Sequence, residues 1–400
     1  MRAAHVITRL IVGGAQENTL SSVLGLRQKP DFEITLISGP STGSEGSLEP
    51  QAAAIPGLLT ILPELVRPVH PWKDLLAWKK LTGHFRATRP DLVHTHSGKA
   101  GVLGRLAAAR AGVPLIVHTI HGPSFGPFQG ALANAAFTAA ERRAGKVTTH
   151  FVVVAEAMTQ QYLAAGIGRP GQYTRVFSGF DLAPFREARN DPDARARWGL
   201  AADDFVVGKI ARLCELKGHD DLLAVAPELV RSHPRMKLLL VGDGPWRARF
   251  EQRVGALGLK RHIIFTGLVP PAQIPELVGV MDVLVHLSRR EGLPRALAQA
   301  LAAARPVIAF NCDGAGEVCR HGETGFLLAP GDLAGLRARL EELVEHPERG
   351  QFLGRQGQEF VRARFSVEQM VNDLHALYRR LDSSHGIVAA HRRSHPDSKP

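Results

Sequence analysis

Short apolar segments alternate along the chain with longer segments in which apolar residues recur at helical spacing. Apolar runs of this length, bounded by Gly, Pro and polar clusters, are typical of buried strands. Because the connections are long enough for one helix each, the strands are expected to pair in parallel. The pattern predicts an α/β fold, with strands at residues 4–8, 32–38, 91–96, 114–121, 149–156, 173–178, 205–212, 236–245 (ending in a Gly-Asp-Gly turn), 262–270, 281–287 and 307–310.

The strand–helix rhythm is interrupted once, at residues 179–199, where charges, Pro and Gly replace the apolar pattern. We therefore predict two Rossmann-like domains, at residues 1–180 and 181–364, with the ligand site expected in a cleft between them. Outside this rhythm, residues 39–63 are predicted as a long loop. The stretch after Glu317 is predicted as a hairpin or turn followed by an amphipathic helix, residues 365–382 as a final helix, and residues 383–400 as a disordered tail.

Composition narrows the class of protein. The apolar fraction of 44% and charged fraction of 22% are ordinary for a globular protein of 400 residues. The N-terminal segment is a poor signal peptide, and no apolar stretch approaches the ~20 residues of a membrane-spanning helix. Because Cys214, Cys312 and Cys319 form neither a disulfide framework nor a metal-ligand spacing, we expect a cytoplasmic protein.

The net charge of +11 is concentrated in the first half of the chain. Residues 1–180 hold 18 Lys and Arg against 10 Asp and Glu, a difference of +8. This excess favours an anionic partner: a phosphorylated substrate, an acidic lipid surface or nucleic acid. Nucleic acid is disfavoured because no nucleic-acid-binding module is recognisable and few aromatic residues accompany the basic ones.

Residues 72–90 combine an apolar stripe with lysines and an arginine, which permits two interpretations. The helix could lie on an anionic membrane surface at the inner face of the membrane. We favour a layer helix that buries its stripe against a sheet. The stripe consists of Trp72, Leu75, Leu76, Trp78, Leu81 and Phe85.

Several predicted strand ends carry residues suited to binding. Gly13 and Gly14 follow the first strand, where they allow either a close backbone approach to a ligand or simply a tight turn. His94 and His96 alternate on one strand, but without a nearby Cys or carboxylate we expect satisfied or substrate-contacting histidines rather than metal ligands. His121 ends its strand before Gly122, at the sheet edge where α/β folds bind ligands.

The second half carries an anion-site pattern at residues 288–317. Glu291 lies on a turn between an apolar strand and an Ala-rich helix, where free backbone N–H groups and the helix dipole favour an anion. Arg212 and Lys217 lie together in the turn after another strand. Two cations in one turn fit a diphosphate, the Arg as a planar fork and the Lys as a point charge.

Seven motifs in order resemble family 4 of the retaining, nucleotide-sugar-dependent glycosyltransferases, which have the two-domain GT-B architecture. The resemblance spans about residues 4 to 381. Each motif is weak alone, and their order and strand-end placement make the set specific. The motifs are Gly13-Gly14, THSGKAG (95–101), HTIHG (118–122), R-L-x3-K-G (212–218), VGDGP (241–245), FTG (265–267) and EGLP (291–294).

The resemblance implies a role for each motif. Arg212 and Lys217 would bind the donor diphosphate, and Glu291 would bind hydroxyls of the donor sugar. Backbone N–H groups near Gly292 and Leu293 would contact phosphate, as would the loop at Gly13 and Gly14. His121 would contact the donor sugar, and the segment around Gly267 and Leu268 would meet the base. The last helix would pack back on the first domain.

One position departs from the family pattern. The family has a second Glu eight positions after the first, and this second Glu binds the ribose hydroxyls. In this chain that position is Gln299. The spacing would place Gln299 two turns into the helix on the same face. Its amide oxygen can still accept one hydrogen bond, at a cost on the order of 1 kcal/mol in donor binding.

The resemblance implies retaining sugar transfer from a UDP or GDP sugar to a glycan or lipid-linked acceptor in cell-surface glycan synthesis. No Asp-x-Asp motif in a credible context offers a metal site, so we expect neither a metal nor another cofactor. A non-catalytic relative that binds nucleotide sugar remains the alternative, supported by Gln299. A Rossmann dehydrogenase is disfavoured because no G-x-G-x-x-G follows the first strand.

Overall fold

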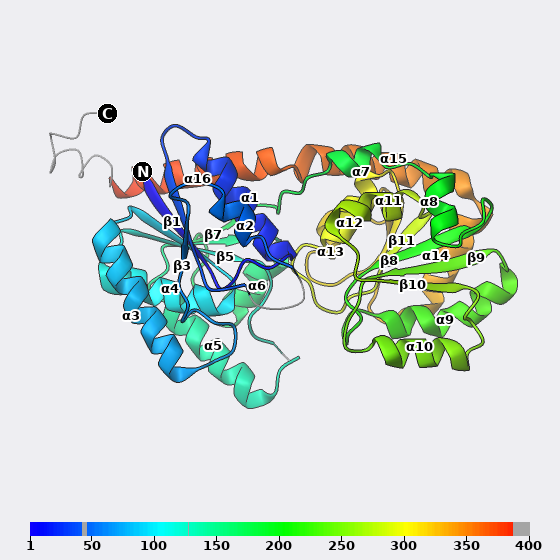
Figure 1. Cartoon of the computed structure of the whole chain (residues 1–400), viewed down its shortest axis with the longest axis horizontal. Helices are drawn as coiled ribbons and strands as arrows, with labels where there is room; N and C mark the ends of the chain where they lie inside the picture. The colour runs from blue at the N-terminus through cyan, green and yellow to red at the C-terminus, as the bar shows by residue number, and fades with distance from the viewer. Residues whose placement is uncertain (42–45, 127, 387–400) are drawn as a thin grey trace. The chain divides into compact units, whose positions relative to one another are not determined.

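The computed structural model describes residues 1–41, 46–126 and 128–386. The chain forms two compact units, each built on its own parallel sheet with helices on both faces (Figure 1). The first unit contains Met1–Gly179 and the helix that begins at Val367. The second contains Phe180–Ser366. Two Rossmann-like units confirm the predicted fold class.

The sheet of the first unit has seven parallel strands in the order β3-β2-β1-β4-β5-β6-β7. The order reverses between β1 and β4, and such a switch point is where α/β sheets bind ligands beyond the carboxyl ends of their strands. The strands are β1 (Arg2–Ile7), β2 (Glu33–Ser38), β3 (Leu59–Ile61), β4 (Leu92–His96), β5 (Leu115–Ile120), β6 (His150–Val153) and β7 (Tyr173–Arg175).

Alternation along the strands divides the core of the first unit between two faces. In β1, Ala3 and Ile7 pack with α1 and α16, whereas Ala4 and Val6 pack with α3 and α4. Helix α16 therefore completes one face of this sheet. The helices are α1 (Gly14–Arg27), α2 (Glu49–Ala53), α3 (Pro71–Thr88), α4 (Gly98–Ala111), α5 (Ala131–Gly145), α6 (Glu156–Ala164) and α16 (Val367–His385).

The sheet of the second unit has six parallel strands in the order β10-β9-β8-β11-β12-β13, so its order reverses at β8. Most residues of its inner strands are apolar and buried, as expected for a parallel sheet covered on both faces. The strands are β8 (Phe205–Ile210), β9 (Met236–Val241), β10 (Ile263–Gly267), β11 (Val283–His286), β12 (Val307–Phe310) and β13 (Gly325–Leu328).

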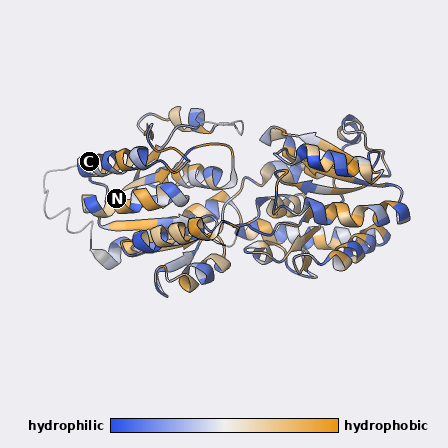
Figure 2. Cartoon of the chain, turned by 90° about the horizontal axis from the view of Figure 1, so that it is seen from below, coloured by the Kyte–Doolittle hydropathy of each residue, from blue (hydrophilic) through white to orange (hydrophobic). Residues whose placement is uncertain are grey.

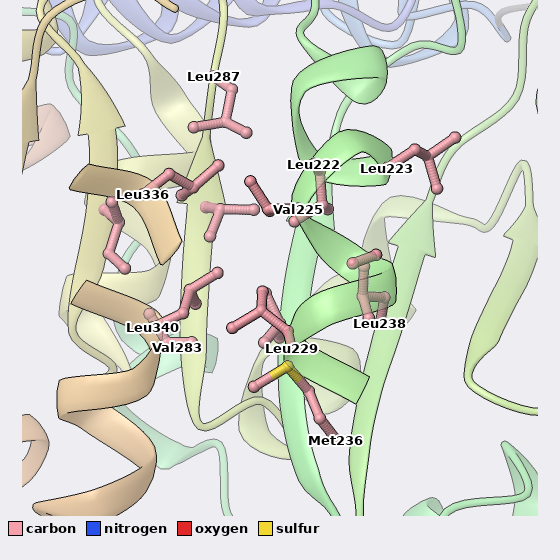
Figure 3. Close-up of a cluster of buried hydrophobic side chains, with 14 of the residues drawn as sticks. Leu222, Leu223, Val225, Leu229, Met236, Leu238, Val283, Leu287, Leu336 and Leu340 are labelled. Carbon is pink, nitrogen blue, oxygen red and sulfur yellow. The ribbon is translucent and has the colours of Figure 1, made fainter. Parts of the chain in front are cut away.

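One face of this second sheet packs on α9 and α14 through a cluster of buried Leu, Val and Met side chains (Figure 3). The helices carry both hydrophobic and hydrophilic residues, as layer helices do (Figure 2). They are α7 (Ala183–Glu187), α8 (Pro192–Arg197), α9 (His219–Ser232), α10 (Arg247–Ala256), the 3-10 turn η1 (Pro271–Gln273), α11 (Ile274–Gly279), α12 (Arg295–Ala302), α13 (Ala315–Val318), α14 (Leu333–Glu345) and α15 (Pro347–Arg364).

Two local predictions were wrong, the second of them only in part. Residues 39–63, expected as one loop, contain helix α2 and the edge strand β3, because Leu36 and Ser38 offer backbone partners that the sequence does not show. Of the hairpin or turn expected after Glu317, the turn is present at residues 322–324, but it leads into β13, which pairs in parallel with β12 and not in a hairpin. The predicted tail lies outside the described residues from 387 onward. Among the described helices, none is long and apolar enough to cross a membrane.

Helix α3 corrects the prediction that its whole apolar stripe is buried. Leu81 and Phe85, in its second half, are buried against the first sheet. Trp72 and Leu76, in its first half, remain 73% and 45% exposed. The helix therefore packs at one end and presents apolar side chains to solvent at the other.

Candidate functional site

Four loops of the second unit gather at the carboxyl ends of β8, β9, β10 and β11, which are neighbours in the sheet. The loop after β8 carries Arg212 and Lys217, and the turn after β11 carries Glu291. Because β8 and β11 pair directly, these two loops lie beside each other at the switch point. The cations and the carboxylate singled out from the sequence thus belong to adjacent loops.

Glu291 is held between two nitrogen donors. Its Oε1 lies 2.5 Å from Lys217 Nζ and 3.1 Å from His286 Nε2. Burial opposes ionisation of this carboxyl, but the hydrogen bond from His286 and the charge of Lys217 outweigh it and hold the Glu291 pKa well below its usual range. Burial lowers the pKa of His286, so its ring serves as a neutral N–H donor. Glu291 is a fixed anion at neutral pH.

The turn that carries Glu291 is fastened to the loop after β8. Arg289 N–H donates to Leu216 O at 2.8 Å, and its guanidinium forms a fork with the Asp221 carboxylate. On the other side, Glu291 N–H donates to Asp313 Oδ2 at 2.7 Å. These bonds fix the position of the carboxylate before any ligand arrives.

Among the residues that the structure describes, the Arg212 side chain differs from that of Lys217 in having no partner. This side chain is exposed, and no hydrogen bond or ion pair links it to any residue that the structure describes. Within the same described ranges, the backbone N–H groups of Gly292 and Leu293 have no acceptor. A free guanidinium and free N–H groups on adjacent loops are suited to binding an anion.

Two glycines shape this edge of the sheet. Gly218 has a φ of +67°, and a Cβ there would lie 2.0 Å from Leu287 O, so only glycine allows the two loops to approach. Gly267 ends β10 with a φ of +72°. It is followed by Leu268, which is 67% exposed and available for an apolar contact.

Sequence reasoning missed Lys209, a buried lysine within β8. Burial and the nearby charge of Lys217 lower its pKa to about 7, while Asp221 and Glu291 oppose that shift. Lys209 is therefore close to the charged residues of the candidate site. The sequence could have indicated this residue, because a lysine inside an otherwise apolar strand is unusual.

Gln299 does not lie at the helix position that its spacing from Glu291 predicted. Helix α12 begins at Arg295, so Gln299 is about one turn into the helix rather than two. Glu291 precedes the helix, and the two residues do not share a helix face. Gln299 is 6% exposed.

In the first unit, the three singled-out residues follow β1 and β5. Gly13 precedes α1, and Gly14 is its first residue. Outside the adjoining backbone, no atom of the described residues lies within 4 Å of where a Gly14 Cβ would be. His121 follows β5 and is half-buried. Burial lowers its pKa to about 4, so its ring is neutral at pH 7. His96 Nδ1 lies 3.2 Å from its Nε2.

Comparison with known proteins decides the family. Residues 190–360 match the sequence profile of the glycosyl transferases group 1, and residues 13–178 match that of the glycosyl transferase 4-like domain. The chain is 30% identical over 334 residues to EpsD of Bacillus subtilis, described as a glycosyltransferase, covering 79% of this chain and 84% of EpsD. The chain belongs to the group 1 glycosyltransferases, family 4.

Two further matches are informative. The chain is 27% identical over 337 residues to the UDP-Gal:alpha-D-GlcNAc-diphosphoundecaprenol alpha-1,3-galactosyltransferase of Escherichia coli, covering 83% of this chain and 85% of that enzyme. The structure of Anabaena HepE in complex with UDP-glucose aligns with a TM-score of 0.77 at 21% identity, over 95% of this chain and all of HepE. This glycosyltransferase therefore has the GT-B fold of a retaining, nucleotide-sugar-dependent family.

Proposed function

We propose that this glycosyltransferase transfers a hexose from a UDP or GDP sugar, with retention, to a hydroxyl of a glycan or lipid-linked acceptor in cell-surface glycan synthesis. The observation that carries the proposal is the ionised Glu291 beside Lys217, with the unpaired Arg212 on the same loop as Lys217. A carboxylate beside Lys217, with Arg212 on the same loop as Lys217, can bind sugar hydroxyls and a diphosphate at once. The name of the E. coli relative, which specifies a UDP sugar and a diphospholipid acceptor, supports both substrate classes.

In this proposal each donor group has one task. Arg212 and Lys217 bind the diphosphate, and the N–H groups of Gly292 and Leu293 contact its oxygens. Glu291 accepts hydrogen bonds from the hydroxyls of the donor sugar, and Gln299 accepts one from the ribose. Gly267 and Leu268 contact the base. In the first unit, Gly13 and Gly14 are assigned to the donor phosphate and His121 to the donor sugar.

In the chemical step, the enzyme mainly has to stabilise the negative charge that develops on the leaving diphosphate, and no covalent enzyme intermediate is required. The acceptor oxygen forms a bond to the anomeric carbon while the bond from that carbon to the diphosphate oxygen breaks. The leaving phosphate oxygen takes the acceptor's proton on the same face, which gives retention. Fixed cations placed before reaction stabilise the developing negative charge more than water does. We propose that they make a metal ion unnecessary.

A peripheral contact with an anionic membrane surface is a further part of the proposal, at the inner face of the cytoplasmic membrane. The first half of α3 exposes Trp72, Leu75 and Leu76 beside Lys73 and Lys79. Exposed Trp and Leu flanked by lysines match the composition of helices that lie in an interface. A lipid-linked acceptor would be encountered there.

The deciding experiment combines binding and turnover. A thermal-shift panel of UDP, GDP, ADP and their sugars should identify one base that raises Tm, and the matching sugar with a lipid-linked acceptor should release nucleotide diphosphate with or without EDTA. Arg212→Ala should abolish both effects, while Arg235→Ala, an exposed arginine paired to Asp203, should preserve them. Binding without release for every acceptor would instead favour a non-catalytic relative.

A further inference from the structure

Four histidines and a tyrosine of the first unit form a hydrogen-bonded row that ends at His121. Tyr378 Oη lies 3.2 Å from His5 Nε2, and His5 Nδ1 lies 3.0 Å from His96 Nε2. The row continues from His96 Nδ1 to His121 Nε2 over 3.2 Å. At the other end, Tyr378 Oη bonds His94 Nδ1, whose Nε2 lies 2.6 Å from Thr119 Oγ1.

Strand register explains why these side chains meet. His5 pairs with His94 between β1 and β4, and His96 pairs with Thr119 between β4 and β5. Side chains alternate across a strand, so these residues point to one face of the sheet, the face that α16 covers. Tyr378 reaches them from α16, and its ring is fully buried.

Each ring of the row is a neutral imidazole. Burial lowers the pKa of His5 to about 3 and holds those of His94 and His96 well below their usual range. A neutral imidazole has one N–H donor and one bare acceptor nitrogen, so each ring passes the direction of its hydrogen bond to the next. The row as a whole therefore has two self-consistent arrangements.

The Tyr378 hydroxyl has one proton, so it can donate to His5 or to His94 but not to both. If it donates to His5, then His5 and His96 each donate onward, and Nδ1 of His121 carries the proton. If it donates to His94, every bond reverses, and Nδ1 of His121 is a bare acceptor. Within the described residues, this Nδ1 has no partner of its own.

We propose that Tyr378, His5 and His96 are positioning residues that fix the tautomer of His121, and with it whether His121 donates or accepts at the donor sugar. This inference rests on the proposed contact of His121 with that sugar. It assigns α16 a role in the chemistry as well as in the core. Helix α16 would set the polarity of a group that lies two hydrogen bonds beyond His5.

A metal site is the competing use of this cluster. The ring nitrogens of His5, His94 and His96 lie within 4.8 Å of one another. However, the rings of His5 and His96 are stacked with their planes 15° apart and already bond each other, while His94 stacks on His96 with centroids 4.4 Å apart. A ligand nitrogen points along its ring plane, so stacked rings do not converge on one ion. The hydrogen-bonded row fits this geometry better.

The test reads the tautomer directly and does not depend on turnover. Nitrogen-15 NMR of ring-labelled histidine in the full chain, assigned by His121→Asn, distinguishes N–H from bare nitrogen in each ring. We expect one tautomer at His121 in the wild type and a mixture in Tyr378→Phe and in His96→Phe. Tyr162→Phe, which removes another buried hydroxyl of the same unit, should leave His121 unchanged. Because this readout needs no substrate, its failure is distinct from failure of the proposed function.

With an active donor and acceptor, Tyr378→Phe should lower kcat about tenfold with little change in KM for the nucleotide sugar. Tyr162→Phe should retain wild-type kcat. If the His121 tautomer is the same in the wild type and both row variants, the proposal is overturned. A stoichiometric metal in the purified protein that is lost in His5→Ala would overturn it in favour of a metal site.

Discussion

Lys217 Nζ and Glu291 Oε1 lie 2.5 Å apart, although the two residues belong to different loops and are separated by 74 positions in the chain. The pair joins the loop after β8 to the turn after β11 through a direct side-chain contact. Because Glu291 also bonds His286, Lys217 can exchange part of its contact for a phosphate without leaving the carboxylate unpaired. The pair is thus a pre-formed part of the proposed donor site.

Lys217→Met should lower kcat about 100-fold, because a cation that stabilises the leaving diphosphate is lost. Glu291→Gln should also reduce activity, and the double variant should lose less than the product of the two single effects, since the residues are in contact. Steady-state kinetics of the four proteins give the coupling. Lys237→Met, which replaces a half-buried lysine of the same unit that donates to Arg261 O, is the control. Multiplicative effects would contradict the coupling.

Lys209→Met should have a higher Tm than the wild type near pH 7, and this difference in Tm should shrink as the pH rises toward 10. The Lys209 pKa of about 7 lies below the ~10.4 expected in the unfolded chain. Between these values the unfolded chain binds the extra proton, so the free energy of unfolding of the wild type rises with pH by up to about 1.4 kcal/mol per unit. Below pH 7 both states are protonated, and this slope disappears. A Tm difference that is flat from pH 7 to 10 would refute the assignment.

From the sequence alone, Lys217 and Glu291 could be placed on neighbouring loops, whereas the residues that surround them could not. Lys217 and Glu291 were found because cations and a carboxylate followed strands, and strand ends meet at one sheet edge. Lys209 was overlooked because its role depends on burial, which the apolar strand around it hides. The helix from Arg295 was predicted, but the position of Gln299 was counted from Glu291, which precedes the helix, and was therefore misplaced.

The histidine row could not have been predicted from local patterns. His94 and His96 were expected either to be satisfied or to contact substrate, and in the structure both nitrogens of each ring have a hydrogen-bond partner. Their partners come from β1 and from α16, far away in the sequence, and only strand register and helix docking bring them together. Edge strand β3 was missed for a related reason, because its pairing with β2 is set by the sheet and not by its own composition.

Gln299→Glu should tighten binding of the nucleotide sugar about fivefold, because a charge-assisted hydrogen bond to a ribose hydroxyl replaces a neutral one. The same change should lower Tm of the ligand-free protein, since it buries a carboxylate at a position that is 6% exposed. Calorimetric titration and thermal unfolding measure the two effects. Gln358→Glu, which replaces a side chain bonded to Ala302 O, should lower Tm without tightening binding. Weaker binding by Gln299→Glu would place the ribose elsewhere.

Arg105→Met should destabilise the protein by about 3–5 kcal/mol, because it leaves the Glu141 carboxylate buried without its cation. The pair is 0% and 1% exposed, and Ser124, three residues after His121, donates to the same carboxylate at 2.9 Å. Denaturant unfolding should show the loss, and Arg105→Met with Glu141→Leu should recover part of it. Lys80→Met, in the partly exposed pair with Glu64, should cost less than about 1 kcal/mol. An equally small effect at Arg105 would contradict this account.

Trp72→Asp combined with Leu76→Asp should weaken binding to vesicles that contain phosphatidylglycerol by at least about tenfold, because two exposed apolar side chains are lost from α3. Cosedimentation with these vesicles, and with phosphatidylcholine alone, measures the effect and its dependence on lipid charge. Phe352→Asp alters an exposed aromatic residue of the second unit and should have no effect. If the wild type does not sediment with anionic vesicles, the membrane contact is excluded.

The chain leaves the first unit after Gly179 and returns to it at Val367, and Phe180 N–H donates to Phe365 O at 2.8 Å where the two crossings meet. The second unit is thus an insertion whose ends are adjacent. The core of the first unit includes Met370, Leu374 and Tyr378, which follow the insertion. During synthesis the second unit can therefore fold as soon as it emerges from the ribosome. The first unit must wait for helix α16, and a ribosome that stalls before this helix leaves the earlier half of the enzyme with an open hydrophobic face.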